Sequence, residues 1–173
     1  MMRRRTPAWW LAGLLLGLGA PGALAGQGEA GLPLGTRAPS AVLKDLDGNP
    51  VDLGTWIGKK PLLLEFWAVW CDNCEALLPR MKQARQWVGD RVEFLGVAVA
   101  VSQSRDRVRR YAEQHGMPFR ILYDDDGTAV RAYQAPVTSY VVIVDRGGKV
   151  VYTGVGAEQA FEPALREVSG VTN

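Results

Sequence analysis

The sequence predicts an α/β domain in which helices flank a mixed central sheet, with an added β-hairpin at the N-terminal side. Three observations carry this prediction. From residue 61 onward, apolar stretches of strand length alternate with segments of helical periodicity. Before them, two alternating segments surround the turn signal Asp47–Gly48, and a second strong hairpin pattern comes late, over residues 139–156.

The first half of this pattern leads from the hairpin into a buried strand and a helix. The hairpin is expected within residues 35–53. The nearly continuous apolar run 61–70 is typical of a strand that is buried on both faces. Residues 74–88 have apolar side chains near helical spacing, with Pro79 as an expected kink.

The second half repeats strand and helix and then closes with antiparallel strands. A strand is expected over 91–101, followed by a helix over 104–116 that begins with a serine cap and ends with a glycine. Residues 119–133 predict a short strand, an acidic turn and a short helix. The hairpin 139–156 and a terminal helix over 157–168 complete the domain.

The N-terminal segment has the composition of a secretory signal. Arg3–Arg5 form a basic region, residues 8–20 are apolar, and "ALA" at 23–25 offers a cleavage site between small residues. The alternative is an uncleaved membrane anchor, because no charged residue occurs over 6–28. Either reading predicts an extracytoplasmic protein, periplasmic or secreted and in the second case anchored to the membrane.

The rest of the chain is sufficient for one folded domain. Its 173 residues, 47% of them hydrophobic, can bury a core of ordinary size. We expect a signal peptide or anchor at 1–25, a linker at 26–34 and the domain at 35–173. Without the first segment the chain is almost neutral, so nucleic-acid binding is not expected. We expect a monomer.

The two cysteines, Cys71 and Cys74, stand where the apolar run meets the first helix. A bridge across two intervening residues is a weak structural staple, and a zinc site needs four ligands, whereas the chain has one histidine. We therefore expect a redox pair without a metal or other cofactor. At the start of a helix, the Cys71 thiolate would be stabilised by the helix dipole and free N–H groups. Cys74, one turn further, could then expel a mixed disulfide.

These residues carry a resemblance to a known superfamily. "FWAVWCDNC", followed by Pro79 in the same helix, resembles the active-site segment of thioredoxins. Residues 38–67 are similar to the extra hairpin of exported thioredoxin-like proteins of the TlpA/ResA type, and "VIVDRGGKVV" (142–151) resembles their closing strand and turn. The similarity covers residues 35–168 and implies a thioredoxin-like fold and thiol-disulfide oxidoreductase activity.

The resemblance also assigns roles. It makes Cys71 the attacking thiol and Cys74 the resolving thiol. Glu65, six residues before Cys71, falls where thioredoxins have a buried acid, and burial would raise its pKa and suit it to exchange a proton with Cys74. The alternative is that Glu65 ends its strand facing solvent. The residues expected to contact substrate are Trp70, Asp72, Asn73, Pro136, Val137, Thr138 and Ser139, and those expected to support the site are Trp67 and Pro79.

Three departures from the family pattern have consequences. Leu77 stands where TlpA/ResA-type proteins often have a glutamate, so acid–base assistance would depend on Glu65 alone. Asp72 places a negative charge beside Cys71, which opposes thiolate formation and favours a reductant over a strong oxidant.

The third departure concerns the cis-proline that faces the disulfide in this superfamily. Counting back from the closing strand puts Ser139 at that position, matching the "TSY" stretch puts Val137 there, and residue identity would choose Pro136. Either the loop is shifted to use the Ala135–Pro136 bond, or the peptide is trans and the contacts with substrate differ.

The predicted function is reduction of cysteine pairs in other exported proteins, with apocytochrome c as one substrate class that the resemblance implies. A membrane protein that delivers electrons is the implied second partner. The alternatives are a disulfide oxidase or isomerase, which would differ in reduction potential, and a copper carrier on the same fold, which would bind copper when reduced.

Overall fold

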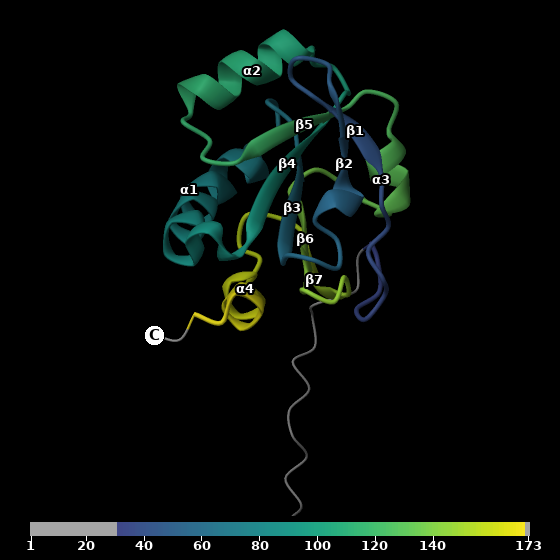
Figure 1. Ribbon diagram of the computed structural model, residues 1–173. Helices are drawn as coiled ribbons and strands as arrows, with labels where there is room; N and C mark the ends of the chain where they lie inside the picture. The colour runs from purple at the N-terminus through teal and green to yellow at the C-terminus, as the bar shows by residue number, and fades with distance from the viewer. Residues whose placement is uncertain (1–30, 172–173) are drawn as a thin grey trace, which may run out of the picture.

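A seven-stranded mixed sheet forms the centre of the protein in the computed structural model, which describes residues 31–171. The strand order is β2-β1-β5-β4-β3-β6-β7 (Figure 1). The strands are β1 (Val42–Asp45), β2 (Pro50–Asp52), β3 (Leu62–Trp67), β4 (Glu93–Val99), β5 (Arg120–Asp124), β6 (Tyr140–Val144) and β7 (Val150–Gly154). The helices are α1 (Asp72–Val88), α2 (Arg105–Gln114), α3 (Thr128–Ala132) and α4 (Glu162–Ser169), with 3-10 turns η1 (Leu53–Thr55) and η2 (Gly89–Arg91).

The pairing directions confirm the predicted mixed sheet. Strands β3, β4 and β5 are parallel, whereas β6 pairs antiparallel with β3, and β7 antiparallel with β6. The N-terminal hairpin of β1 and β2 joins the sheet through an antiparallel pairing of β1 with β5. The thioredoxin-like arrangement with an added hairpin is therefore confirmed.

Strand β3 lies inside the sheet, between β4 and β6, and has no exposed residue. Its alternating side chains serve two separate cores, because successive residues of a strand point to opposite faces. Leu62, Leu64 and Phe66 pack on the first face with α3 and the hairpin. Trp67 packs on the second face, which α1 and α2 cover (Figure 1). Glu65 falls between Leu63 and Trp67 on that second face.

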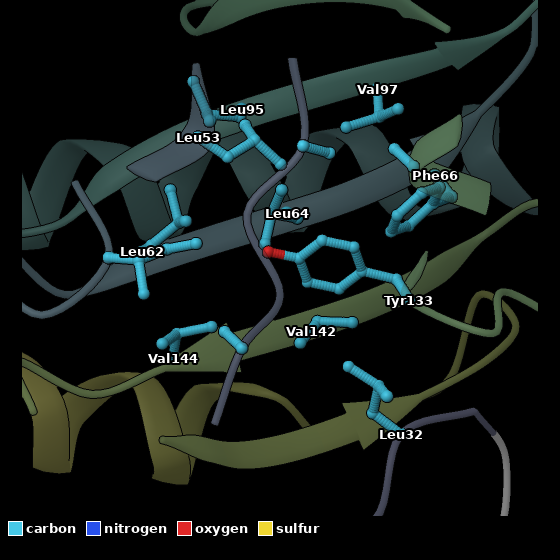
Figure 2. Close-up of a cluster of buried hydrophobic side chains, with 14 of the residues drawn as sticks. Leu32, Leu53, Leu62, Leu64, Phe66, Leu95, Val97, Tyr133, Val142 and Val144 are labelled. Carbon is cyan, nitrogen blue, oxygen red and sulfur yellow. The ribbon is translucent and has the colours of Figure 1, made fainter. Parts of the chain in front are cut away.

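The first-face core also holds the beginning of the described chain. Figure 2 shows Leu32 beside the cluster formed by β3, β4 and β6, with the Tyr133 ring at its centre. The Leu32 backbone N–H donates to the Tyr140 hydroxyl at 3.0 Å, and Gly35 N–H donates to the Val150 carbonyl at 2.7 Å. Leu32 of the predicted linker thus packs against the domain.

The predicted signal segment or anchor at 1–25, and residues 26–30 of the linker, lie outside the described residues. Within residues 31–171, no helix combines the length and the apolar composition that a membrane span requires.

Strand β3 ends earlier, and helix α1 begins earlier, than the sequence pattern predicts. The strand stops at Trp67 because the chain turns there: the Cys71 N–H donates to the Ala68 carbonyl at 3.1 Å. Helix α1 then starts at Asp72, two residues before the predicted start, and continues through Pro79 to Val88. The helix therefore includes the whole segment between the two cysteines.

Candidate active site

Cys71 and Cys74 form a disulfide at the N-terminus of α1, with their Cα atoms 5.3 Å apart. Cys71 is the N-cap of the helix, in an extended conformation, and its Sγ accepts a hydrogen bond from the Cys74 N–H at 3.1 Å. A sulfur atom at this position faces the free N–H groups of the first helical turn, whose partial positive charge favours a thiolate. Both cysteines are largely buried, with 8% and 6% of their surface exposed.

The two tryptophans before the disulfide occupy different environments. Trp67 is buried and shares an apolar cluster with both cysteines, where its ring lies 5.6 Å from that of Tyr111. Trp70 is 44% exposed, and its Nε1–H donates to the Val101 carbonyl at 2.8 Å. Trp67 therefore supports the disulfide from inside, and Trp70 presents an apolar ring beside it.

The first turn of α1 is acidic and open to solvent. Asp72 and Asn73 lie between the two cysteines with exposed side chains, and Glu75 follows Cys74, also exposed. These carboxylates complement the positive end of the helix dipole. They also place negative charge around the thiol pair.

Glu65 is buried beneath this site, with 2% of its surface exposed, so the solvent-facing alternative is wrong. It lies between Gly96 of β4 and Val141 of β6 in the sheet, neither of which brings a charge. Burial alone raises the pKa of Glu65 to about 8. The group is therefore largely protonated at neutral pH and is poised to give up a proton slightly above it.

The other buried acid of the described chain has a structural explanation. The Asp124 carboxylate accepts hydrogen bonds from the Ala129 N–H at 3.2 Å and the Val130 N–H at 2.9 Å, at the start of α3. Leu77, at the position where related proteins often have a glutamate, is fully buried in the second-face core. Glu65 is thus the buried carboxyl group on the cysteine side of the sheet.

The loop before β6 contains all three candidates for the cis-proline position, and every peptide bond of the described chain is trans. Ser139 is the last residue of this loop, and its N–H donates to the Phe66 carbonyl at 2.7 Å, at the end of β3. Its φ of 63° lies in the left-handed region, which costs a residue with a side chain about 1–2 kcal/mol. The loop therefore follows the second alternative, with trans geometry and its own set of contacts.

A network of hydrogen bonds holds Ser139 in this conformation. Its hydroxyl accepts from the Gly156 N–H at 3.1 Å, and its carbonyl accepts from Gln159 Nε2–H at 2.8 Å. The Arg80 guanidinium of α1 in turn donates to the Gln159 carbonyl at 2.7 Å and binds the Glu162 carboxylate through two nitrogens. The helix that contains Cys74 is thereby connected to the loop at Ser139.

The remaining residues of the loop line a surface hollow. Pro136, Val137 and Thr138 border a cavity of about 160 Å³, together with Val99 and Val130. Val137 is 57% exposed. A second cavity of about 280 Å³, lined by residues 99–101, 124–127 and 130, shares Val99 and Val130 with the first. The two cavities thus adjoin at the C-terminal end of β4, and their lining is mostly apolar.

The structure thus gathers Cys71, Cys74 and Trp67 in one cluster and places Glu65 on the same face, whereas Pro79 lies further along α1. Within residues 31–171, no three or more His, Cys, Asp or Glu side chains are grouped as metal ligands. Gln103 and Gln159, which hold the loops around the site, were not predicted. A lone glutamine in a loop gives no sequence signal, because its role depends on contacts across the fold.

Comparisons with known proteins relate this chain to redox proteins. The chain matches the Redoxin family over residues 33–169. It is 29% identical over 143 residues to the thiol-disulfide oxidoreductase ResA of Geobacillus thermodenitrificans, covering 81% of this chain and 80% of that protein. It is 34% identical over 166 residues to the thioredoxin-like protein YneN of Bacillus subtilis, covering 90% and 96%.

A solved structure extends the comparison to three dimensions. The putative thiol:disulfide interchange protein DsbE of Chlorobium tepidum superposes with a TM-score of 0.67 at 27% identity, covering 79% of this chain and 94% of the other. The family match, the sequence relatives and the solved structure all indicate thiol-disulfide chemistry, for which a cysteine pair at a helix N-terminus is suited. The chain therefore belongs to the Redoxin family and is a thiol-disulfide oxidoreductase with a thioredoxin-like fold, similar to the ResA proteins.

Proposed function

We propose that this protein is an extracytoplasmic reductase that transfers electrons from the Cys71–Cys74 dithiol to disulfides of other exported proteins. The observation that carries the proposal is the position of the pair: a disulfide at a helix N-terminus on the same face of the sheet as a buried, uncompensated carboxyl group, Glu65. This arrangement provides a nucleophile, a resolving thiol and a proton carrier on one face of the sheet.

In the proposed cycle, the Cys71 thiolate attacks one sulfur of a substrate disulfide. A bond forms between Cys71 and that sulfur, and the other substrate sulfur leaves as a thiolate. Cys74 then attacks Cys71 Sγ, which closes the protein disulfide and releases the second substrate thiolate. Two electrons and two protons pass to the substrate, and the protein ends in the oxidised form described above.

Glu65 is the proposed proton acceptor for Cys74. The resolving thiol must lose its proton as it attacks, and its surroundings are apolar. The ionised form of Glu65, which becomes the major form above about pH 8, is a suitable acceptor, because its affinity for a proton is close to that of a thiol. The proton would later be released to a substrate thiolate or to solvent.

The proposed docking surface for the substrate surrounds the exposed ring of Trp70. Asp72 and Asn73 lie between the two cysteines with exposed side chains, and we assign the loop 136–139 with its apolar hollow to the same docking surface. Val137 and Val101, both 57% exposed, extend the apolar surface. An extended segment around a cysteine pair, such as that of apocytochrome c, is the substrate class that we infer.

We also propose an extracytoplasmic location and a membrane protein as electron donor. The basic, apolar and small-residue segments of 1–25 support export, with cleavage or with anchoring. A reductase in an oxidising compartment needs its dithiol restored by electrons from the cytoplasmic side, so we propose a membrane protein as its donor. The negative charge of Asp72 beside Cys71 supports the reducing direction over the oxidising one.

The direct test is insulin reduction with dithiothreitol, comparing wild type with Cys71→Ser and Cys74→Ser. Cys71→Ser should abolish exchange, because no nucleophile remains at the helix N-terminus. Cys74→Ser should accumulate mixed disulfides that are visible on non-reducing gels, because the intermediate is no longer resolved. Wild-type turnover equal to that of either variant would overturn the proposal.

A further inference from the structure

The turn that leads from β3 into the disulfide is held by a side chain that is distant in sequence. This turn comprises residues 68–71 and is closed by the Cys71 N–H donating to the Ala68 carbonyl at 3.1 Å. The Val69 N–H lies outside that bond and donates to Oε1 of Gln103 at 2.9 Å. Gln103 stands 34 residues further along the chain, in the loop between β4 and α2.

Gln103 is itself held by hydrogen bonds of its side chain and of its backbone. Its Nε2–H donates to the Val99 carbonyl at 2.5 Å, at the end of β4. Its backbone carbonyl accepts a hydrogen bond from the hydroxyl of Tyr123 at 2.7 Å. Tyr123 is buried in the cluster that includes both cysteines. Because a rigid strand and a buried ring fix Gln103, its Oε1 is a fixed acceptor for the turn.

A second hydrogen bond joins the same two loops one residue further. Trp70 Nε1–H donates to the Val101 carbonyl at 2.8 Å, so the indole ring cannot rotate away without losing its partner. Val101 itself is held by its N–H donating to the Val99 carbonyl at 2.8 Å. The next residue, Ser102, has a φ of 55°, and this left-handed residue turns the chain back so that Gln103 can face the turn.

From this geometry we infer that Gln103 is a positioning residue for thiol-disulfide exchange. It fixes the turn 68–71 so that Cys71 Sγ stays at the helix N-cap, where it accepts the Cys74 N–H. It also keeps the loop that anchors the exposed Trp70 ring against the turn. The inference rests on the proposed role of Cys71 as the attacking thiol.

The chemical consequence concerns the amount of reactive thiolate. Sulfur at the N-cap is stabilised as an anion only while it stays aligned with the N–H groups of the first turn. Without Gln103, the Val69 N–H loses its partner, and the turn can move to find another. A displacement of less than 1 Å at Cys71 would weaken that stabilisation and misalign the attack.

The test measures alkylation of the reduced protein by iodoacetamide as a function of pH, together with insulin reduction. Gln103→Met removes both side-chain hydrogen bonds at nearly constant volume. Its alkylation rate at neutral pH should fall roughly tenfold, and the midpoint of the profile should move to higher pH. The matched control is Gln114→Ala, at an exposed position at the end of α2.

The possible results distinguish a failure of the positioning role of Gln103 from a failure of the proposed function. If the Gln103→Met profile coincides with that of wild type while wild type reduces insulin, the positioning role is wrong and the proposed function stands. If wild type itself fails to reduce insulin, the proposed function is wrong. Should Gln103→Met not fold, Trp70→Phe gives the second test: it keeps an aromatic ring, loses the bond to Val101 and should lower the rate of alkylation by iodoacetamide, which needs no protein docking, by severalfold. An alkylation rate unchanged from wild type would show that the hydrogen bonds between the two loops do not position Cys71.

Discussion

The Ser139 N–H donates to the Phe66 carbonyl at 2.7 Å, so the loop before β6 is tied to the end of the strand that leads to the disulfide. Ser139 forms this bond with a φ of 63°, at the position where the superfamily has a cis-proline by gapless counting. The loop is therefore built for a residue with a free N–H and a left-handed conformation. This requirement has a direct consequence for substitutions.

Ser139→Pro should destabilise the protein instead of restoring the pattern of the superfamily. Proline cannot donate to the Phe66 carbonyl, and its φ is restricted to about −65°, far from the observed 63°. We expect a loss of roughly 3 kcal/mol or more in the free energy of unfolding, measured by guanidinium denaturation of the oxidised form. A variant as stable as wild type would show that the loop readily adopts another conformation.

Ser139→Gly and Ser139→Ala should differ although both lose the hydroxyl. Each removes the acceptor for the Gly156 N–H, but glycine also relieves the left-handed strain. We expect the alanine variant to unfold at lower guanidinium concentration, with a difference between the two of about 1 kcal/mol. Equal midpoints would indicate that Ser139 is not strained.

Glu65→Gln should change the dependence of stability on pH. The pKa of Glu65 is about 8 in the folded protein and close to 4.5 when the chain is unfolded. Between these values the unfolded state releases the proton while the folded state retains it, so wild-type stability should fall as pH rises from 4.5 to 8 and level off above. The total contribution is on the order of a few kcal/mol.

Glutamine does not ionise, so the variant should lose this part of the slope and exceed wild type in stability at pH 9. Denaturation midpoints of both proteins at pH 5, 7 and 9 provide the measurement. In insulin reduction, the variant should be slower because Cys74 lacks its proton acceptor, and an inflection near pH 8 should disappear from the rate profile. Parallel stability curves for the two proteins would exclude a raised pKa at Glu65.

Arg80→Lys should loosen the connection between α1 and the segment before α4. The guanidinium binds the Glu162 carboxylate and the carbonyls of Ala157 and Gln159 at 2.7–2.9 Å, and it lies over the Phe161 ring. A lysine ammonium cannot reproduce this planar set of bonds. We expect a loss of about 1–3 kcal/mol in unfolding free energy, because partly buried carbonyl groups lose a charged donor.

The matched control for that change is Arg110→Lys, at an exposed position of α2. Because Arg80 also fixes the backbone of Gln159, which donates to Ser139, the Arg80 variant should show a higher KM for a protein substrate than wild type. If Arg80→Lys is as stable as Arg110→Lys, the cluster around Arg80 contributes little to the fold.

The direction of electron flow is tested by the reduction potential of the Cys71–Cys74 pair. Equilibration in dithiothreitol buffers, followed by tryptophan fluorescence, should give a value near about −270 mV, as for a reducing thioredoxin. A value near about −120 mV would indicate a disulfide donor and would overturn the inference from Asp72. Asp72→Asn is expected to raise the potential, because it removes the charge that opposes the thiolate.

Much of this architecture is determined by local patterns in the sequence. The alternation of strands and helices follows from the spacing of apolar residues, and the hairpin follows from Asp47–Gly48, because these signals act between neighbours in the chain. The cysteine spacing and the apolar run before it likewise predict the redox pair, and the resemblance to thioredoxins implies a buried Glu65. The apolar pattern alone overestimates the length of β3 at its C-terminal end, since the turn at 68–71 depends on hydrogen bonds and not on hydrophobicity.

Only the tertiary structure decides what holds the two loops around the disulfide. Gln103 and Gln159 act across 34 and 20 residues, respectively, through amide hydrogen bonds to backbone groups, and such contacts leave no periodic signal. The conformation of Ser139 is decided in the same way. The sequence offers three candidates for the cis-proline position, Pro136, Val137 and Ser139, and only the hydrogen bond from Ser139 to Phe66 selects one loop geometry. Reactive residues can be recognised from the local sequence, whereas the orientation of their side chains depends on the packing of the whole fold.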